Sequence, residues 1–342
     1  MPDLSLDGDA ATALPATITA WRQRRYGGPE TVTRERIDLP QPGRGEVLLR
    51  VRATALNAGD IRVMRGTPYL VRAFFGLTRP RVPGRGMDVA GTVVALGEGV
   101  DAWAVGDEVV GELPGGGLAE YVVAPATALV GRPETVTAAD AAAVPVAAGT
   151  AWQALELART DLAGRRVLVV GASGGVGTFA VQLAVARGAE VWALCGERNR
   201  GLVAGLGATE VHDYRGTGVG DLPPSSCDVI VDIAGTAPLR SLRRALRDRG
   251  TAVLVAGDGG GVLGPIPRIF AALFTSRPRR RIVPLMAQGR PEMLRRLLEL
   301  VDAGTVRPVI ERTYPLDDAR AALAHVDAGR TVGKVVVVPD LD

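Results

Sequence analysis

The chain has 342 residues, of which 47% are hydrophobic and 23% are charged, and its formal net charge is +3. This length is enough for two domains with a large buried core. No apolar run reaches the roughly 18 residues of a membrane-spanning helix, and basic side chains that alternate with acidic ones argue against a nucleic-acid-binding surface.

Cysteine and histidine are scarce: the chain has Cys195, Cys227, His212 and His325. A structural zinc site needs four ligands and a catalytic site three, and neither histidine lies near a cysteine at ligand spacing. We therefore expect no zinc, no other metal site and no disulfide framework. Two buried, inert thiols are typical of a protein in the reducing cytoplasm.

The first half of the chain is predicted to be rich in strands. Residues 1–15 lack the basic start and apolar core of a signal peptide and are predicted to be a disordered leader. Short alternating segments then predict a small antiparallel barrel, with strands at residues 46–53, 87–96, 107–111 and 119–125. From residue 137 the sequence is alanine-rich and helical, and Pro145 divides it into two helices.

From residue 166 onward, apolar strands alternate with amphipathic helices. This pattern predicts a parallel sheet covered on both faces, with strands at residues 167–170, 190–195, 210–214, 228–234, 251–257 and 281–287. The last part of the chain returns to the strand-rich pattern. The predicted small domain is therefore discontinuous (16–145 and 288–342), with a dinucleotide-binding domain inserted at 146–287.

The segment ASGGVG (residues 172–177) follows a predicted strand and opens a predicted helix. It matches the dinucleotide-binding fingerprint with alanine at the first glycine. Gly174 would let the backbone approach a pyrophosphate, Gly177 would let the helix pack closely on the strand, and the helix N-terminus would face the phosphates. The alternative is a strand–turn–helix without a ligand, although the following strand also fits the fingerprint.

The end of that following strand selects between the two nicotinamide cofactors. An NAD site carries an acidic residue there, about 20 residues past the glycines, whereas this chain has Gly196 with Arg198 two residues on. A small residue and a guanidinium suit a 2′-phosphate, so NADPH is favoured. Glu197 keeps NADH open, since a shift of one residue would bring it to the ribose.

The sequence resembles the zinc-independent branch of the medium-chain dehydrogenase/reductase superfamily, the quinone oxidoreductase or zeta-crystallin type. The resemblance covers nearly the whole chain after the leader. It rests on segments that include ALNAGD, MDVAGTVVALGEGVDAWAVGDEVVG, AEYVV, GTAWQAL, VGASGGVGTFAVQLA, LGATEVHDY and the terminal GKVVVV. It implies a GroES-like β-barrel catalytic domain, a Rossmann domain, a substrate cleft between them and a homodimer.

The resemblance also implies site residues. Asn57 would lie beside the nicotinamide, Thr150 at the nicotinamide ribose or carboxamide, and Tyr214 beside the 2′-phosphate, while Asp60 would hold the shape of its loop. The full predicted cofactor site comprises Asn57, Thr150, Ser173, Gly174, Gly175, Val176, Gly196, Arg198, Tyr214, Ala234, Gly257 and Lys334.

Two departures from the family matter for the chemistry. Zinc-dependent relatives carry Cys-His where this chain has Asn57-Ala58, and Gly-His-Glu where it has Gly86-Met87-Asp88. Many quinone reductases carry a tyrosine where this chain has Arg62, so its substrate or the way that the substrate binds is expected to differ.

The predicted activity is metal-free hydride transfer from NADPH to an acceptor that is already electrophilic, a quinone or an α,β-unsaturated carbonyl. The candidate catalytic residues are Asn57, Arg62 and Tyr69, which would steady a developing anion or supply a proton. Each has a plainer alternative, namely a loop tether, a surface residue and a packing residue. The rival functions are a nucleotide-binding sensor or structural protein with little turnover and a metal-free NADP-dependent alcohol dehydrogenase.

Residues 262–281 form an unusual insert before the last predicted strand of the parallel sheet. Its apolar half contains Phe270 and Phe274, and its basic half is SRPRRR. The insert is predicted to line the acceptor pocket or to make a subunit contact, with a membrane surface as the third reading.

Overall fold

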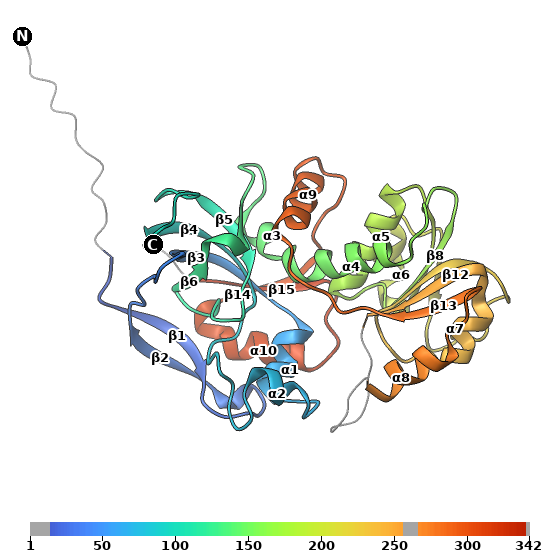
Figure 1. The fold of residues 1–342 in the computed structure, drawn as a ribbon, viewed down its shortest axis with the longest axis horizontal. Coiled ribbons are helices and arrows are strands. Elements are labelled where there is room, and N and C mark those ends of the chain that lie inside the picture. Colours follow the sequence, from blue (N-terminus) through green and yellow to red (C-terminus); the bar gives the residue numbers. More distant parts are fainter. Residues whose placement is uncertain (1–13, 256–265, 340–342) are drawn as a thin grey trace, which may run out of the picture.

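The computed structural model describes residues 14–255 and 266–339. The chain forms a strand-rich lobe and a lobe built on a parallel sheet, with helix α4 (Pro145–Leu157) between them (Figure 1). Pro145 occupies the first turn of α4, directly after helix α3 (Ala138–Ala142), so the predicted division into two helices is confirmed.

The strand-rich lobe is organised around a seven-stranded sheet. Its strands are β3 (Glu46–Leu56), β4 (Asp88–Leu96), β5 (Glu108–Glu112), β6 (Tyr121–Pro125), β7 (Leu129–Gly131), β14 (Ile310–Pro315) and β15 (Lys334–Val338). The order is β14-β15-β3-β4-β5-β7, with β6 also paired to β3. All four predicted strands are present, but the sheet is not purely antiparallel, because β14 runs parallel to β15.

Two strands of this lobe form a separate antiparallel ribbon that the sequence pattern did not predict, β1 (Thr17–Gln23) and β2 (Val32–Asp38). Only the first residue of β2 is buried, so the strand has little apolar alternation to detect. Helices α1 (Ala58–Arg65), α2 (Val71–Phe75) and α10 (Ala319–Asp327) complete the lobe.

The second lobe contains the predicted parallel sheet. Its strands are β8 (Arg166–Val170), β9 (Glu190–Cys195), β10 (Glu210–Asp213), β11 (Cys227–Asp232), β12 (Leu246–Leu254) and β13 (Arg280–Pro284). All neighbouring pairs run parallel in the order β10-β9-β8-β11-β12-β13. The order reverses at β8, and a doubly wound sheet binds its ligand at this switch point.

Both faces of this sheet are covered. Along β8, Val167 and Val169 belong to the core shared with α4 and with α5 (Gly175–Ala186), whereas Leu168 and Val170 belong to the core shared with α7 (Leu239–Ala245). Of the other α-helices in the described chain, α6 (Arg200–Gly205) and α8 (Ile266–Thr275) also belong to this lobe, whereas α9 (Pro291–Asp302) packs against α4 and β7. The alternation of buried side chains confirms the predicted two-faced sheet.

Two elements differ from the prediction. The strand predicted to begin at residue 251 begins at Leu246 instead, where it pairs with Cys227 of β11, so α7 ends at Ala245. The insert contains α8, which the sequence pattern did not identify as a helix. The division at 145/146 and 287/288 stays a prediction, as does the leader.

Candidate active site

A cleft of about 620 Å³ lies between the two lobes. The strand-rich lobe contributes Asn57 and Arg62, and the other side contributes Thr150, Val176 and Ala234. A second cavity continues from it and is lined by Asn57, Val176, Gly174, Gly175 and Lys334. The structure therefore brings together eight of the residues predicted for the site.

The glycine turn joins β8 to α5, and its glycines differ in what requires them. A Cβ at Gly177 would lie 2.2 Å from the carbonyl oxygen of Gly171, so close packing of helix on strand excludes any side chain. A Cβ at Gly174 would meet only that same oxygen at 3.6 Å, an ordinary contact, and its φ of −80° suits any residue. Protein packing thus gives no reason for glycine at 174, whereas close approach of a pyrophosphate does.

The chain has the features that a dinucleotide needs at this turn. The first N–H groups of α5 have no acceptor within the helix and lie at its positive end. Ser173 accepts a hydrogen bond from Asn199 (3.0 Å), and its carbonyl accepts one from Gly333 (2.8 Å), which holds the turn against the start of β15. The residues present therefore fit a nicotinamide dinucleotide.

The end of β9 has an open corner at Gly196. A Cβ there would lie 3.5 Å from the Tyr214 ring and 3.8 Å from the guanidinium of Arg215, which also stacks over Tyr214. Arg198 is exposed and donates to the carbonyl of Arg330 (3.0 Å). Arg215 was not among the predicted residues; its place beside β9 follows from the pairing of β10 with β9.

Glu197, the residue that would favour NADH as the cofactor, forms an ion pair within the protein. Its carboxylate lies 3.1 Å from the guanidinium of Arg200. An ion pair on the surface is weak, but it gives Glu197 a partner other than a ribose.

A buried polar cluster lies where the cleft and the second cavity meet. The Asn57 amide donates to Asp88 (2.9 Å), and the Lys334 ammonium donates to the Asn57 oxygen and to Asp88 (3.2 Å). The side chains of Lys334 and Asp88 are 2% and 0% exposed. Burial raises the pKa of Asp88, while the Lys334 ammonium acts in the opposite direction. The sequence signal for this cluster is the single lysine of the chain, placed in an apolar strand.

Asp60 has the structural role that the resemblance implies. Its carboxylate accepts hydrogen bonds from the backbone N–H groups of Asn57 (2.9 Å) and Gly86 (2.8 Å), and it joins two loops of the strand-rich lobe. Burial raises its pKa to about 6, against these two hydrogen bonds.

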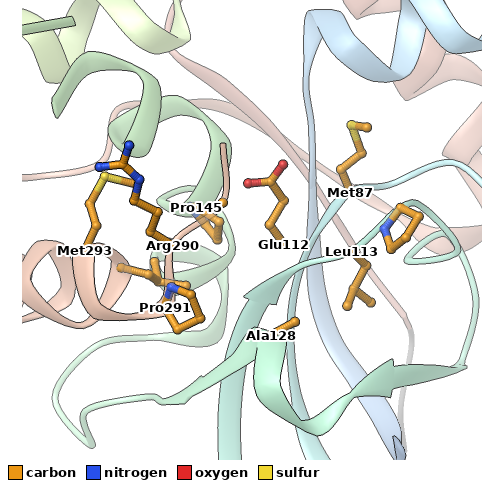
Figure 2. Close-up of a pocket in the computed structure, with 11 residues that line it drawn as sticks. Met87, Glu112, Leu113, Ala128, Pro145, Arg290, Pro291 and Met293 are labelled. Carbon is orange, nitrogen blue, oxygen red and sulfur yellow. The ribbon is translucent and has the colours of Figure 1, made fainter. Parts of the chain in front are cut away.

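A third cavity, of about 320 Å³, adjoins the cleft (Figure 2). Its lining is largely apolar and includes Met87, Leu113, Ala128, Pro291 and Met293. The carboxyl group of Glu112, from the end of β5, points into the space between Pro145 and Met87 (Figure 2). Sequence reasoning missed Glu112, because nothing in the motif GDEVVGE marks its last residue as facing a cavity.

Several predicted residues lie elsewhere. Tyr69 is 51% exposed, stacks on Arg72 and is absent from the lining of the three cavities above; its catalytic role stays a prediction. Gly257 lies outside the described residues. Phe270 and Phe274 of α8 are 57% and 79% exposed and line none of these three cavities.

Within residues 14–255 and 266–339, no three His, Cys, Asp or Glu side chains are grouped so that they could hold a metal ion. Both cysteines are free and buried, and burial raises the pKa of each thiol. No helix in the described part of the chain is both long and apolar enough to span a membrane.

Two family profiles match the chain. The profile described as "Alcohol dehydrogenase GroES-like domain" matches residues 43–134, and the one described as "Zinc-binding dehydrogenase" matches residues 206–337. Together they cover parts of both lobes.

Several curated proteins with similar sequences are oxidoreductases by name. The chain is 36% identical over 326 residues to the chloroplast envelope quinone oxidoreductase homolog of Arabidopsis thaliana, covering 92% of this chain and 95% of the relative. It is 32% identical to the mitochondrial NAD(P)H oxidoreductase RTN4IP1 of Mus musculus (98% and 93% covered). It is 31% identical to the 2-methylene-furan-3-one reductase of Solanum lycopersicum (96% and 80% covered).

A solved structure with the same fold is that of the quinone oxidoreductase from Coxiella burnetii. Its TM-score is 0.84 at 26% identity, over 94% of this chain and 99% of the other.

Proposed function

Because the chain belongs to the medium-chain dehydrogenase/reductase superfamily, in its quinone oxidoreductase branch, we propose that it transfers a hydride from NADPH to a quinone or an α,β-unsaturated carbonyl, without a metal. The GroES-like and Rossmann-like domains expected from the sequence are those of this family. The names of its relatives support oxidoreduction with a nicotinamide cofactor.

The observation that carries the proposal is the buried cluster of Asn57, Asp88 and Lys334. By the resemblance above, Asn57 and Asp88 occupy positions that belong to the zinc motifs of zinc-dependent relatives. In this chain both are hydrogen-bonded to the Lys334 ammonium, a cation of the protein itself. A site built in this way suits an acceptor that needs positioning more than polarisation by a metal.

The residues of the chain have distinct tasks in this reaction. A bound reduced nicotinamide supplies the hydride. Thr150, Val176 and Ala234 line the cleft and orient the ligand. The Asn57 amide uses one N–H on Asp88 and keeps a second N–H for a ligand oxygen, and the Arg62 guanidinium at the cleft stabilises a developing oxygen anion.

The preference for NADPH rests on the corner at Gly196. Arg198 and Arg215 offer two guanidinium groups near this corner, and a guanidinium binds phosphate with paired, charge-assisted hydrogen bonds. Glu197 is engaged with Arg200. These contacts support a 2′-phosphate site over a ribose hydroxyl site.

The test is oxidation of NADPH by the purified protein with a panel of quinones and enones, before and after treatment with a chelator. We expect acceptor-dependent oxidation that survives the chelator. Tight NADPH binding without acceptor-dependent oxidation would instead favour a nucleotide-binding sensor. Reduction of NADP⁺ by simple alcohols after chelation would favour a metal-free alcohol dehydrogenase.

We also propose that the protein is a cytoplasmic homodimer, as the resemblance and the cysteine content imply. Sedimentation of the purified protein and fractionation of its native cells test the two parts separately. The relatives named above include chloroplast and mitochondrial proteins, so fractionation is needed for this chain itself.

A further inference from the structure

Glu112 occupies the place where two cavities meet. It lines the cleft that holds Thr150, Val176 and Ala234, and it also lines the adjoining apolar cavity of Figure 2. Met87 and Pro145 are shared in the same way. An acceptor that reaches from the cleft into the apolar cavity would therefore pass the Glu112 carboxyl.

This carboxyl has no structural task that accounts for its burial. In the part of the chain that the structure describes, it makes no hydrogen bond and no ion pair. The backbone of Gly289 lies beside it, since a Cβ at Gly289 would be 2.9 Å from Oε2 of Glu112. A half-buried carboxyl without a partner is costly, and such groups are enriched at functional sites.

The surroundings favour the protonated form of this carboxyl. Burial, and then the charges of Asp88 on β4 and Asp60 on α1, raise the pKa of Glu112 to about 7, against the Lys334 ammonium on β15. Arg290, before α9, lines the same cavity, but its guanidinium lies 4.0 Å from Glu156. Arg62 of α1 lines the cleft together with Glu112, but it forms no ion pair with this carboxyl in the described residues. Near neutral pH the group can therefore both hold and release a proton.

We propose that Glu112 is the proton donor of the reductase reaction and that its substrates are α,β-unsaturated carbonyls with an apolar substituent. The proposal rests on the function proposed above. The hydride from NADPH forms a C–H bond at the β-carbon with its own electron pair. The electron pair of the carbon–carbon double bond moves toward the carbonyl group, which gives an enolate. The O–H bond of Glu112 then breaks, its proton forms the C–H bond at the α-carbon, and the carboxylate takes a proton from water.

Quinones depend less on such a donor. A hydroquinone is a phenol, and phenols have a pKa of about 10, so its anion is a much weaker base than an enolate and can leave the cleft before it takes a proton from water. Enone and quinone reduction therefore separate the proton-transfer role of Glu112 from hydride transfer. The apolar cavity would hold the substituent next to the reacting carbons.

The test compares Glu112→Gln with Glu98→Gln, a change at an exposed glutamate of the strand-rich lobe. For Glu112→Gln we expect kcat with an enone to fall about 10²-fold or more. With a quinone we expect kcat to change much less, and the NADPH affinity of the variant to stay as in the wild type. Glu98→Gln should match the wild type with both acceptors.

Two further readouts do not depend on turnover at one pH. The wild-type kcat/KM for the enone should fall as the pH rises through about 7, and this limb should be absent from Glu112→Gln. In the cofactor-free protein, a carbon-13 titration of the glutamate carboxyls should contain one resonance with a midpoint near 7, absent from the same variant.

The outcomes distinguish a failure of the Glu112 assignment from a failure of the proposed function. A wild-type protein that reduces enones while Glu112→Gln matches it in rate and pH profile overturns the assignment of Glu112 alone. If no enone and no quinone serves as an acceptor for NADPH oxidation by the wild-type protein, the proposed function is overturned, and the assignment of Glu112 with it.

Discussion

At the scale of single residues, the phosphate turn shows that neighbouring glycines serve different purposes. Gly177 is required by packing, because a Cβ there would overlap the carbonyl oxygen of Gly171. Gly174 has room for a Cβ in the protein alone. An alanine at position 177 would therefore disturb the packing of the helix on the strand, whereas an alanine at position 174 would chiefly disturb the bound ligand.

Gly174→Ala should weaken NADPH binding by roughly tenfold or more, about 1.4 kcal/mol, because the methyl group would occupy the space of the pyrophosphate. Gly174 is the N-cap of α5, and alanine is a poorer N-cap than glycine. We therefore expect Gly174→Ala to lower the free energy of unfolding by less than about 1 kcal/mol. Fluorescence titration with NADPH and urea denaturation measure the two effects. The control is Gly201→Ala in α6, where a Cβ meets nothing within 4 Å; a Gly174→Ala protein with normal affinity would contradict the assigned role.

Arg215 carries a second prediction at this scale. Arg215→Ala and Arg198→Ala should each reduce NADPH affinity roughly tenfold or more, the value of a charge-assisted hydrogen bond. NADH affinity should stay nearly constant, which makes NADH an internal control, and Arg44→Ala in the strand-rich lobe controls for loss of charge in general. Equal losses for both cofactors would show that these arginines do not read the 2′-phosphate.

At the scale of elements, α1 is fixed in place by one buried carboxylate. Asp60 accepts the N–H of Asn57 at the start of the helix and the N–H of Gly86 from the loop before β4. These contacts set the position of Asn57 and of the cluster with Asp88 and Lys334. The chemistry of the cleft thus depends on a residue that does not line it.

Asp60→Ala should lower the free energy of unfolding by roughly 2–4 kcal/mol, because two buried N–H groups lose their acceptor. Asp60→Asn keeps one carbonyl acceptor, and we expect about half of that loss. Urea denaturation of both variants measures the effect. If Asp60→Ala were as stable as the wild type, water or a rearranged loop would have to satisfy both N–H groups.

Helix α8 shows a second anchor of this kind. The Arg268 guanidinium pairs with Asp232, which is fully buried at the end of β11. The ion pair fixes α8 against the carboxyl end of the parallel sheet, while Phe270 and Phe274 stay exposed. Among the side chains of α8 that the structure describes, Arg268 with its ion pair and Ala272, which belongs to the core on that face, attach the helix to the sheet.

At the scale of the whole molecule, buried carboxyls make stability depend on pH. Burial raises the pKa of Glu112 from 4.5 to about 7 and that of Asp60 from 3.8 to about 6. Between about pH 4 and about pH 7 these two carboxyls bind more protons in the folded protein than in the unfolded chain, so the free energy of unfolding falls as the pH rises. The contribution is fully present below about pH 4 and lost above about pH 7.

We therefore expect the wild-type Tm to fall between pH 5 and pH 8, and the Tm of Glu112→Gln to fall less. The difference attributable to Glu112 is at most about 2–3 kcal/mol, and its partial exposure to solvent reduces it. Differential scanning calorimetry across this pH range measures it, with Glu98→Gln as the control. A Glu112→Gln protein with the wild-type pH profile would place the pKa of Glu112 in its ordinary range.

The local signals in the sequence were sufficient for the fold and for the glycine turn of the candidate site, whereas Asn57 and Thr150 were expected from the family resemblance. Each of these signals spans only about 20 residues of the chain. The alternation of apolar strands with helices identifies a parallel sheet, and the glycines between β8 and α5 identify a phosphate turn. Strand β1 escaped prediction because its burial comes from distant segments, as in the contacts of Trp21 with Leu118 and Leu316, and β2 escaped because only its first residue is buried.

The sequence by itself determined the two-domain organisation, the nucleotide turn and the scarcity of possible metal ligands, because each depends on composition or on residues close in the chain. Only the tertiary structure decided that Asn57, Asp88 and Lys334 form one buried cluster and that Glu112 faces the cleft. These residues come from four elements that are far apart in the chain and lie side by side through strand pairing. Burial and the charges of distant neighbours, which set their protonation, exist only once the chain is folded.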